Sequence, residues 1–311
     1  MSLNELGVEA ERTEVFCSML FAPGNRPDLV EKAICSEADA VIVDLEDAVP
    51  FESKANARSY LAELPESKIP LYVRVNGGDL NHLWPDLQAV GYGKVDGIVL
   101  PKAENAELIV AIDGALTMVE LASGRNIGST VIVPLIETST GIVQGNSTLR
   151  ASLRVKSVMF GSAEQGDLFA DLGGQWTPDG TALLYARSQV LVAAKAAGVA
   201  NSLDGPFLNL SDLSQLRVEC ELARRIGYTG KVAIHPSQIA IIHDVFTPSP
   251  AEIAAQQRVL DAFKEALDAG SSLVKVDGRM VDYAVAKVAQ TVIDRADVAR
   301  KREARLVGMK E

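Results

Sequence analysis

Charged side chains follow directly on apolar runs at several points of this chain. The run in "VPLIETSTG" ends on Glu137, and the run in "YVRVNGG" is interrupted by Arg74. Lys102 follows "GIVLP", and Glu46 and Asp47 follow "DAVIVDL". Carboxylates from neighbouring strand ends could share Mg²⁺, which prefers oxygen ligands and keeps several waters. A nearby guanidinium could neutralise negative charge that develops on a substrate. These residues favour metal-assisted chemistry, through an enolate, on carboxylate and keto oxygens.

The second acid of such a metal pair lies in "FGSAEQGDLFADLGG". This stretch offers Glu164, Asp167 and Asp171. The chain has no cluster of His and Cys with zinc spacing, no phosphate-binding loop of the Walker type and no dinucleotide-binding glycine motif. A hard cation held by oxygens is therefore the metal that the sequence favours.

Each of these side chains also has an ordinary structural interpretation. A single acid at a strand end is more often a helix cap or a solvated loop charge. Lys102 could bind a substrate carboxylate, or it could pair structurally with Glu46. Arg74 could simply pair with Glu46 or Asp47. The argument for a site comes from the whole set, because caps do not require apolar strands to lead directly into Arg or Lys.

The elements that must position these residues alternate regularly along the chain. Helix-like segments such as 26–38, 105–123 and 182–198 lie between short apolar runs, a pattern typical of βαβ units and a parallel sheet. Eight such units predict an α/β fold, a (β/α)8 TIM barrel whose active site lies where the strands end. The expected strands are 18–24, 39–47, 70–78, 96–104, 130–138, 155–163, 201–206 and 230–238.

The domain organisation follows from this count. Residues 1–245 are predicted to form the barrel as a catalytic domain. Residues 246–311 are predicted to form a C-terminal helical extension, in which the amphipathic tail covers the barrel or a partner subunit.

Composition excludes several classes of function. The formal net charge is -11, which argues against nucleic acid as a partner, since such surfaces are basic. No apolar stretch approaches the roughly 20 residues of a membrane span. The polar start "MSLNELGVEAERTEVF" lacks the basic and apolar regions of a signal peptide. The three cysteines are scattered, as in a reducing compartment. Together these features predict a cytoplasmic protein.

Several motifs in order resemble the citrate lyase β-subunit family, part of the aldolase/citrate lyase superfamily that includes malyl-CoA and citramalyl-CoA lyases. The resemblance runs from about residue 17 to about residue 285. Its motifs are "SMLFAPGNRPDLVEKA", "DAVIVDLEDAVP", "YVRVNGG", "GIVLPKAE", "VPLIETSTGI", "FGSAEQGDLFADLG", "AIHPSQI" and "VDGRMVD".

The resemblance implies a Mg²⁺-dependent lyase or synthase for a carbon–carbon bond in a 3-hydroxyacyl thioester such as malyl-, citramalyl- or citryl-CoA. The products of cleavage are a 2-keto acid and an acyl-CoA, formed through an enolate. Glu137 matches a metal ligand of the family, and Arg74 matches the arginine that binds substrate oxygens. Glu46 and Asp47 match acids that hold metal-bound water. The resemblance also implies a homo-oligomer, a trimer or hexamer, in which Asp282 of "GRMVD" donates a proton in a neighbouring subunit's site.

Two departures from the family pattern affect these assignments. Many relatives have "FGxxD" before the helix, and that position here holds Glu164, with an Asp-Leu pair three residues later. We favour Asp167 as the second ligand, with Glu164 as the alternative. Relatives also commonly have Arg-Ser at the first strand, where this chain has Cys17-Ser18. We place this missing arginine near the mouth of the barrel and expect it to affect substrate choice.

Two alternative functions remain. The chain could be the β-subunit of a multi-subunit citrate lyase that acts on a thioester of an acyl-carrier protein. It could also be a thioester hydrolase or a ligand-binding relative that has lost the lyase step. Both alternatives use the same barrel and site. Products and partners therefore distinguish them, and sequence does not.

Overall fold

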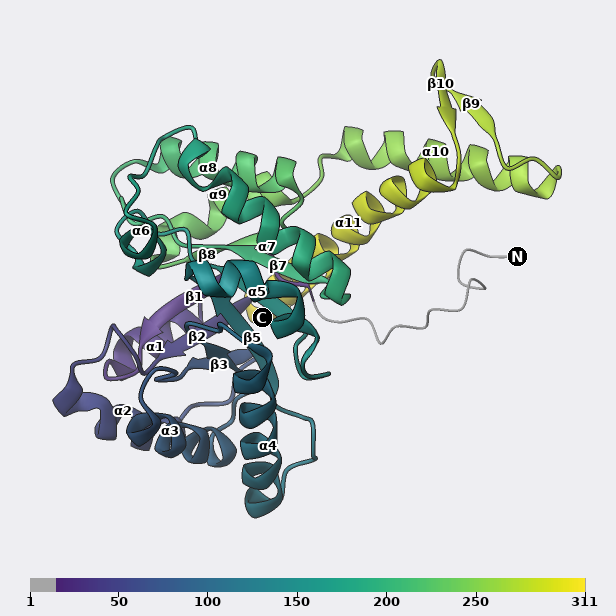
Figure 1. Ribbon diagram of the computed structural model, residues 1–311. Helices are drawn as coiled ribbons and strands as arrows, with labels where there is room; N and C mark the ends of the chain where they lie inside the picture. The colour runs from purple at the N-terminus through teal and green to yellow at the C-terminus, as the bar shows by residue number, and fades with distance from the viewer. Residues whose placement is uncertain (1–14, 311) are drawn as a thin grey trace. The chain divides into compact units, whose positions relative to one another are not determined.

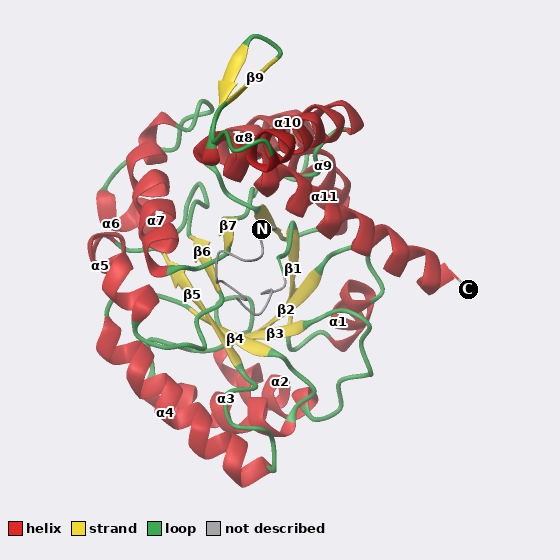
Figure 2. Cartoon of the chain, turned by 90° about the vertical axis from the view of Figure 1, so that its right-hand side faces the viewer, coloured by secondary structure: helices red, strands yellow, loops and turns green. Residues whose placement is uncertain are grey.

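Eight parallel strands close into a barrel in the computed structural model, which describes residues 15–310. Each strand pairs with its neighbour in the sequence, and β1 pairs with β8 to close the ring. Figure 2 shows the strands ringed by helices. The strands are β1 (Ser18–Pro23), β2 (Ala40–Asp44), β3 (Leu71–Arg74), β4 (Gly97–Leu100), β5 (Val131–Ile136), β6 (Ser157–Phe160), β7 (Asn201–Asp204) and β8 (Gly230–Ala233). The predicted TIM barrel is confirmed, with all eight strands inside the expected ranges.

The helices of the barrel follow the strands in the order expected of βα units (Figure 1). They are α1 (Pro27–Ile34), α2 (Lys54–Leu61), α3 (Leu80–Tyr92), α4 (Ala106–Ser123), α5 (Ser139–Arg150), α6 (Asp167–Leu172), α7 (Leu184–Ala197), α8 (Leu213–Ile226) and α9 (Ile239–Phe246). Several begin on a side chain that accepts a hydrogen bond from the first turn. Asp79 caps α3, Asn105 caps α4 and Thr138 caps α5. Such caps fix where each strand-to-helix loop ends.

The barrel interior is packed with apolar side chains from successive strands. Met19, Ile42, Val99, Val133 and Leu203 belong to this core, and none is more than 2% exposed. Strand β2 is buried at every position because helices cover one face and the barrel interior covers the other. The centre of the barrel is therefore a packed core, and ligand chemistry is confined to the mouth, the end where the carboxyl ends of the strands lie.

The chain divides into two compact units between His243 and Asp244. The second unit holds α10 (Pro250–Asp268), the antiparallel pair β9 (Val274–Val276) and β10 (Arg279–Val281), and α11 (Tyr283–Lys310). Its small core gathers around Phe263, Val281 and Ala286. The division lies two residues before the boundary that we place at 245/246 from the sequence. The contact of this segment with a neighbouring subunit stays a prediction.

Two expectations from the sequence concern a membrane span and a signal peptide. None of the helices between residues 15 and 310 is both long and apolar enough to span a bilayer. The segment in which we find no signal peptide lies almost entirely outside the described residues.

The position of Cys17 corrects one expectation. Cys17 directly precedes β1, so it lies at the amino end of that strand, opposite the mouth. It is buried, and its backbone N–H donates to Asp39 Oδ2 at 2.8 Å. The sequence analysis places this departure near the mouth, and that is wrong, because the whole of β1 separates Cys17 from the mouth. Cys17 therefore contacts no group at the mouth.

Candidate active site

An arginine and an aspartate end two neighbouring strands at the mouth. Asp44 is the last residue of β2 and Arg74 the last of β3, and the two are paired in the parallel register. Arg74 Nε donates to Asp44 Oδ1 at 2.7 Å, and Nη2 donates to Oδ2 at 2.6 Å. The side chains are 13% and 2% exposed. This two-pronged pairing fixes the plane of the guanidinium.

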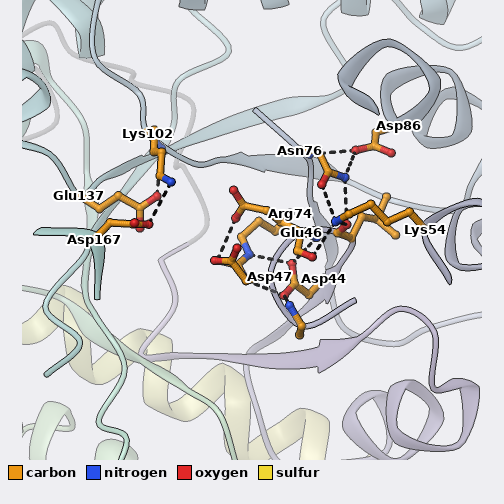
Figure 3. Close-up of polar contacts among 12 residues, drawn as sticks. Asp44, Glu46, Asp47, Lys54, Arg74, Asn76, Asp86, Lys102, Glu137 and Asp167 are labelled. Atoms are coloured by element: carbon orange, nitrogen blue, oxygen red, sulfur yellow. Dashed lines mark hydrogen bonds and ion pairs between the residues drawn. The ribbon is translucent and has the colours of Figure 1, made fainter. Parts of the chain in front are cut away.

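Two further acids face the same guanidinium from the loop after β2 (Figure 3). Arg74 Nη1 lies 3.1 Å from Glu46 Oε2 and 3.5 Å from Asp47 Oδ2. The guanidinium carbon also lies 5.0 Å from the centre of the Phe21 ring, which gives a cation–π contact. The pairing that we considered as a structural role for Arg74 is present, and Asp44 contributes most to it.

A fourth acid, Glu137, follows β5 and faces the mouth from the other side. Its Oε1 accepts a hydrogen bond from the backbone N–H of Lys102 at 3.0 Å. Lys102 has a φ of 49°, a left-handed backbone that a residue with a side chain adopts rarely. Such conformations cluster at functional sites, where the surrounding structure maintains them. The strand ends of β4 and β5 are therefore tied together at Glu137.

Asp167 begins α6 and lies on the same side of the mouth as Glu137 and Lys102 (Figure 3). Lys102 Nζ lies 3.3 Å from Asp167 Oδ2, and both side chains are 43% exposed. The ion-pair partner of Lys102 is thus Asp167, whereas the structural alternative from the sequence named Glu46. The ammonium therefore pairs with one of the two acids that we consider as metal ligands.

The other two candidate acids lie differently. Glu164 is exposed and does not line the pocket at the mouth. Asp171 accepts a hydrogen bond from the backbone N–H of Ser139 at 2.6 Å, at the start of α5. This bond joins the helix that carries Asp167 to the loop that carries Glu137. Asp171 therefore orients the pair of acids.

A glycine after β6, Gly161, allows the side chain of Glu137 to lie close to the backbone there. A Cβ added at Gly161 would lie 2.4 Å from Cβ of Glu137, far inside a normal contact. Any larger residue at the end of β6 would displace Glu137.

These side chains surround a pocket of about 140 Å³. Its floor is apolar and is formed by residues such as Leu135, Met159 and Val232. Its polar wall consists of Asp47, Arg74, Glu137 and Asp167. An apolar pocket with a few convergent charges is the usual form of a small-molecule site.

Burial changes the pKa values of the ionisable side chains at the mouth. It raises the pKa of Glu46 to about 8, since the lowering effect of Arg74 does not outweigh burial and the neighbouring carboxylates. It also raises the pKa of Glu137 to about 7, with a further raising effect from Asp167. Burial lowers the pKa of Arg74, but the ion pairs with Asp44, Glu46 and Asp47 raise it overall. The arginine is thus permanently charged, and the two glutamates lack full compensation.

The acids fit a magnesium ion. Residues 15–310 contain no group of three or more His, Cys, Asp or Glu arranged to hold a metal. Magnesium needs no such group, because it is commonly bound by one or two carboxylates and several waters. Glu137 and Asp167 offer two hard oxygen donors, and the raised pKa of Glu137 indicates a carboxylate that an added cation would stabilise.

Asp282 lies in the second unit, where it caps α11. Its Oδ1 accepts a hydrogen bond from the backbone N–H of Val285 at 3.0 Å. Its side chain is exposed. In this chain Asp282 is therefore a helix cap, and its catalytic role in a neighbouring subunit stays a prediction.

Sequence reasoning missed two contributors to the mouth. Asp44 lies in the apolar run that leads to Glu46 and Asp47, but spacing alone does not predict its two-pronged bond to Arg74. Lys54 is not singled out at all, although its ammonium donates to backbone oxygens of Leu45 and Glu46. The available signal is a lysine in the first turn of a helix, where acids are preferred.

A family model for the HpcH/HpaI aldolase/citrate lyase family matches residues 17–236. The citrate lyase subunit beta of Leuconostoc mesenteroides is 36% identical over 284 residues, which cover 90% of this chain and 93% of that protein. A (3S)-malyl-CoA thioesterase of Cereibacter sphaeroides is 34% identical over 277 residues, covering 88% and 92%.

Solved structures agree with these matches. The protein CitE from Mycobacterium tuberculosis, in complex with magnesium, acetoacetate and coenzyme A, is 32% identical with a TM-score of 0.73. The match covers 91% of this chain and 98% of that one. RipC from Yersinia pestis is 30% identical with a TM-score of 0.65, covering 78% and 99%. The chain therefore belongs to the HpcH/HpaI aldolase/citrate lyase family and is an enzyme of the lyase type.

Proposed function

We propose that this protein is a Mg²⁺-dependent carbon–carbon lyase that acts on a 3-hydroxyacyl thioester of coenzyme A. Malyl-, citramalyl- and citryl-CoA are the candidate substrates, and the products are a 2-keto acid and an acyl-CoA. The observation that carries the proposal is the pocket in which the fixed guanidinium of Arg74 faces the two acids Glu137 and Asp167. The magnesium and coenzyme A of the CitE complex support the cofactor and the substrate class.

Glu137 and Asp167 would hold the metal, which supplies Lewis-acid polarisation of substrate oxygens when bound. As the carbon–carbon bond breaks, the 3-hydroxyl loses its proton to water held by Glu46 and Asp47 and becomes the keto group. The electron pair of the broken bond passes to the acyl thioester as an enolate, which Asp282 of a neighbouring subunit would protonate to give the acyl-CoA. Arg74 is held in place by Asp44 before the reaction, so its charge can stabilise the enolate oxygen without reorganisation. Glu46 and Asp47 orient water and substrate on the side of β2. Lys102, on the rim, binds a substrate carboxylate.

The test of this function is a turnover screen with the three thioesters, with and without Mg²⁺, monitored by keto-acid release. We expect release with at least one substrate and loss of release in EDTA. Product analysis distinguishes the proposed lyase from a thioesterase, which is the alternative that the Cereibacter relative supports. A hydrolase yields a free diacid and coenzyme A, whereas a lyase yields a keto acid and an acyl-CoA.

The alternative function, as a subunit of a larger complex, requires another experiment. It is supported by the β-subunit relatives. Purification from native extract would recover an acyl-carrier protein and further subunits if the protein works on a carrier-bound thioester. Recovery of the chain alone, active on the coenzyme A thioester, favours the stand-alone lyase.

The metal assignment is tested by calorimetry. Glu137→Gln and Asp167→Asn are each expected to weaken Mg²⁺ binding at least tenfold, about 1.4 kcal/mol, because each removes a charged ligand. Glu164→Gln is the matched control, an exposed acid three residues before Asp167. Parental affinity in Glu137→Gln contradicts the site, and a loss in Glu164→Gln with none in Asp167→Asn transfers the second ligand to Glu164.

A shared site between subunits is tested by complementation. Asp282→Asn and Arg74→Ala are each expected to be nearly inactive. Co-expressed in one homo-oligomer, which we expect to be a trimer or hexamer, they should recover turnover, because some sites then combine an intact Arg74 with an intact Asp282. An active monomer, or no recovery in purified mixed oligomers, contradicts the role of Asp282.

A further inference from the structure

Lys54 stands at an unfavourable place for a lysine. It is the first residue of α2, and the first turn of that helix holds no acid. The amino end of a helix carries a partial positive charge, which stabilises Asp and Glu there and repels an ammonium. The reason for a lysine at this position has to come from its contacts.

The ammonium of Lys54 uses all three of its N–H donors on the loop after β2 and its neighbour strand (Figure 3). It donates to the backbone oxygen of Leu45 at 2.8 Å and to that of Glu46 at 2.8 Å. The third bond goes to Asn76 Oδ1 at 2.7 Å. An ammonium has three donors and no acceptor, so this side chain is fully engaged.

Asn76 holds the lysine and the loop from the side of β3. Its Nδ2 donates to the backbone oxygen of Leu45 at 2.9 Å and to Asp86 Oδ2 at 2.7 Å. Its backbone N–H donates to the same Asp86 oxygen at 2.9 Å. Asp86 has no exposed surface, and Arg58 Nη1 donates to its other oxygen at 3.1 Å. The Asn76 side chain that binds Lys54 is therefore itself held by the buried Asp86, whose charge Arg58 balances.

The same loop is held from the opposite side by Asp44. The backbone N–H of Glu46 donates to Asp44 Oδ1 at 2.9 Å, and that of Ala48 donates to Oδ2 at 3.0 Å. The loop is thus held through its carbonyls by Lys54 and through its amides by Asp44. Between these two anchors it carries Glu46 and Asp47, both of which face Arg74.

We propose that Lys54 is a positioning residue that fixes the loop after β2, so that Glu46 and Asp47 face Arg74 in the geometry the reaction needs. This inference rests on the proposed lyase function. Lys54 does not line the pocket, so it acts through the loop and without touching the substrate. It also does not contact Glu137 or Asp167, so the metal pair does not depend on it.

The experiment compares Lys54→Met, Lys54→Gln and Lys54→Arg in the full-length protein with Mg²⁺. Lys94→Met is the matched control, since Lys94 is a lysine that pairs with Glu66 at the surface, away from the loop after β2. The readouts are amide hydrogen exchange at Glu46 and Ala48, the melting temperature, Mg²⁺ affinity, and kcat and KM on the substrate found in the screen.

For Lys54→Met we expect roughly tenfold to hundredfold faster exchange of the loop amides and a similar fall in kcat, the range for loss of charged hydrogen bonds. KM and Mg²⁺ affinity should change less than threefold. Lys54→Arg should recover part of both losses, Lys54→Gln should fall between, and Lys94→Met should match the parent.

Parental exchange at Glu46 and Ala48 in Lys54→Met overturns the inference. It is also overturned if exchange rises while kcat stays parental, or if kcat falls only in proportion to the folded fraction. If Lys54→Met does not fold, Lys54→Gln decides by the same criteria. If the parent turns over none of the thioesters, the proposed function fails, whereas the exchange measurement still decides whether Lys54 orders the loop.

Discussion

Two ionic clusters of the barrel differ in how their charges are balanced. The first lies behind β7 and β8 and is almost fully buried. Lys231 Nζ lies 2.7 Å from Asp204 and 3.0 Å from Glu219, and Arg187 Nε lies 2.9 Å from Asp204. Burial alone would raise the pKa of Asp204, but Arg187 and Lys231 lower it overall. Each charge in this cluster faces an opposite charge.

The second cluster is the mouth, where the balance differs. Burial raises the pKa of Glu46 to about 8 and that of Glu137 to about 7. A structural acid elsewhere shows the opposite result. Glu120 is fully buried, whereas Glu46 and Glu137 are half-buried, and hydrogen bonds from Arg154 and from Gly128 and Thr130 bring its pKa down to about 2. The direction of the shift thus separates an acid whose hydrogen bonds outweigh its burial from acids whose burial outweighs their contacts.

Removing one cation from each cluster gives the largest expected effects. Arg74→Met is expected to lower kcat by about 10²–10³, as for the loss of one preorganised charge in a transition state, and Arg74→Lys should restore it only in part. Lys231→Met is expected to destabilise the fold by about 3–5 kcal/mol, because it leaves buried acids uncompensated. Steady-state kinetics and thermal melts on the same samples measure both.

The comparison predicts that these two losses are separate. Turnover per folded molecule should stay near parental in Lys231→Met. In Arg74→Met it should fall by the full factor of about 10²–10³, beyond any loss of stability from leaving Asp44, which is 2% exposed, without its cation. Near-parental kcat with a depressed melting temperature in Arg74→Met would make Arg74 a scaffold residue. The mouth would then be a second structural cluster.

The sequence was sufficient for the barrel because each strand is a short apolar run that ends in polar residues. Even the least apolar run, which contains Asn201 and Asp204, forms β7. Parallel strands direct their carboxyl ends to one mouth, so Arg74 and Glu137 could be placed there without coordinates. Asp167 came from the resemblance, and its contact with Lys102 agrees with a place at the mouth.

The remainder depends on distances that spacing does not contain. Lys54 reaches Asn76 across 22 residues, and only the packing of α2 against the barrel brings them together. The sequence analysis placed Cys17 at the wrong end of β1. A motif predicts that a strand is present, but it does not predict how far each residue lies from the mouth. The role of Asp282 depends on a neighbouring subunit, which one chain does not include.

The pH dependence of stability tests the uncompensated state of Glu46. Its folded pKa of about 8 lies above the ordinary value of 4.5. Below pH 4.5 the carboxyl is protonated in both states, so it has no effect. Between these values the unfolded chain releases the proton and the folded chain retains it, so stability falls as pH rises, by at most about 1.4 kcal/mol per pH unit. Above pH 8 the effect is complete.

Thermal melts from pH 4.5 to 8.5 in EDTA measure this slope. Glu46→Gln is expected to make it shallower, since the amide does not titrate, and the remaining slope comes from Glu137, whose pKa is about 7. The matched control is Glu66→Gln, which removes an exposed glutamate whose side chain is 87% accessible and should leave the slope unchanged. Equal slopes in the parent and Glu46→Gln would show that Glu46 is compensated like the acids of the buried cluster.

The smallest effect concerns Lys102, whose charge lies beside one acid of the metal pair. Its ammonium lies 3.3 Å from Asp167 Oδ2, but both side chains are 43% exposed. Solvent screens such a pair, which is worth at most about 1 kcal/mol. Lys102→Met keeps the backbone N–H that holds Glu137 and removes only the competing positive charge. We therefore expect Mg²⁺ to bind up to about fivefold more tightly by calorimetry, with Lys102→Arg near parental.

If Lys102 also binds a substrate carboxylate, KM should rise in Lys102→Met while kcat changes little. Weaker Mg²⁺ binding in Lys102→Met would mean that the lysine supports the site, and the acids Glu137 and Asp167 would then need another explanation for their proximity. Unchanged affinity and unchanged KM would make Lys102 a solvated charge on the rim, and the metal pair would be less compensated than the comparison assumes.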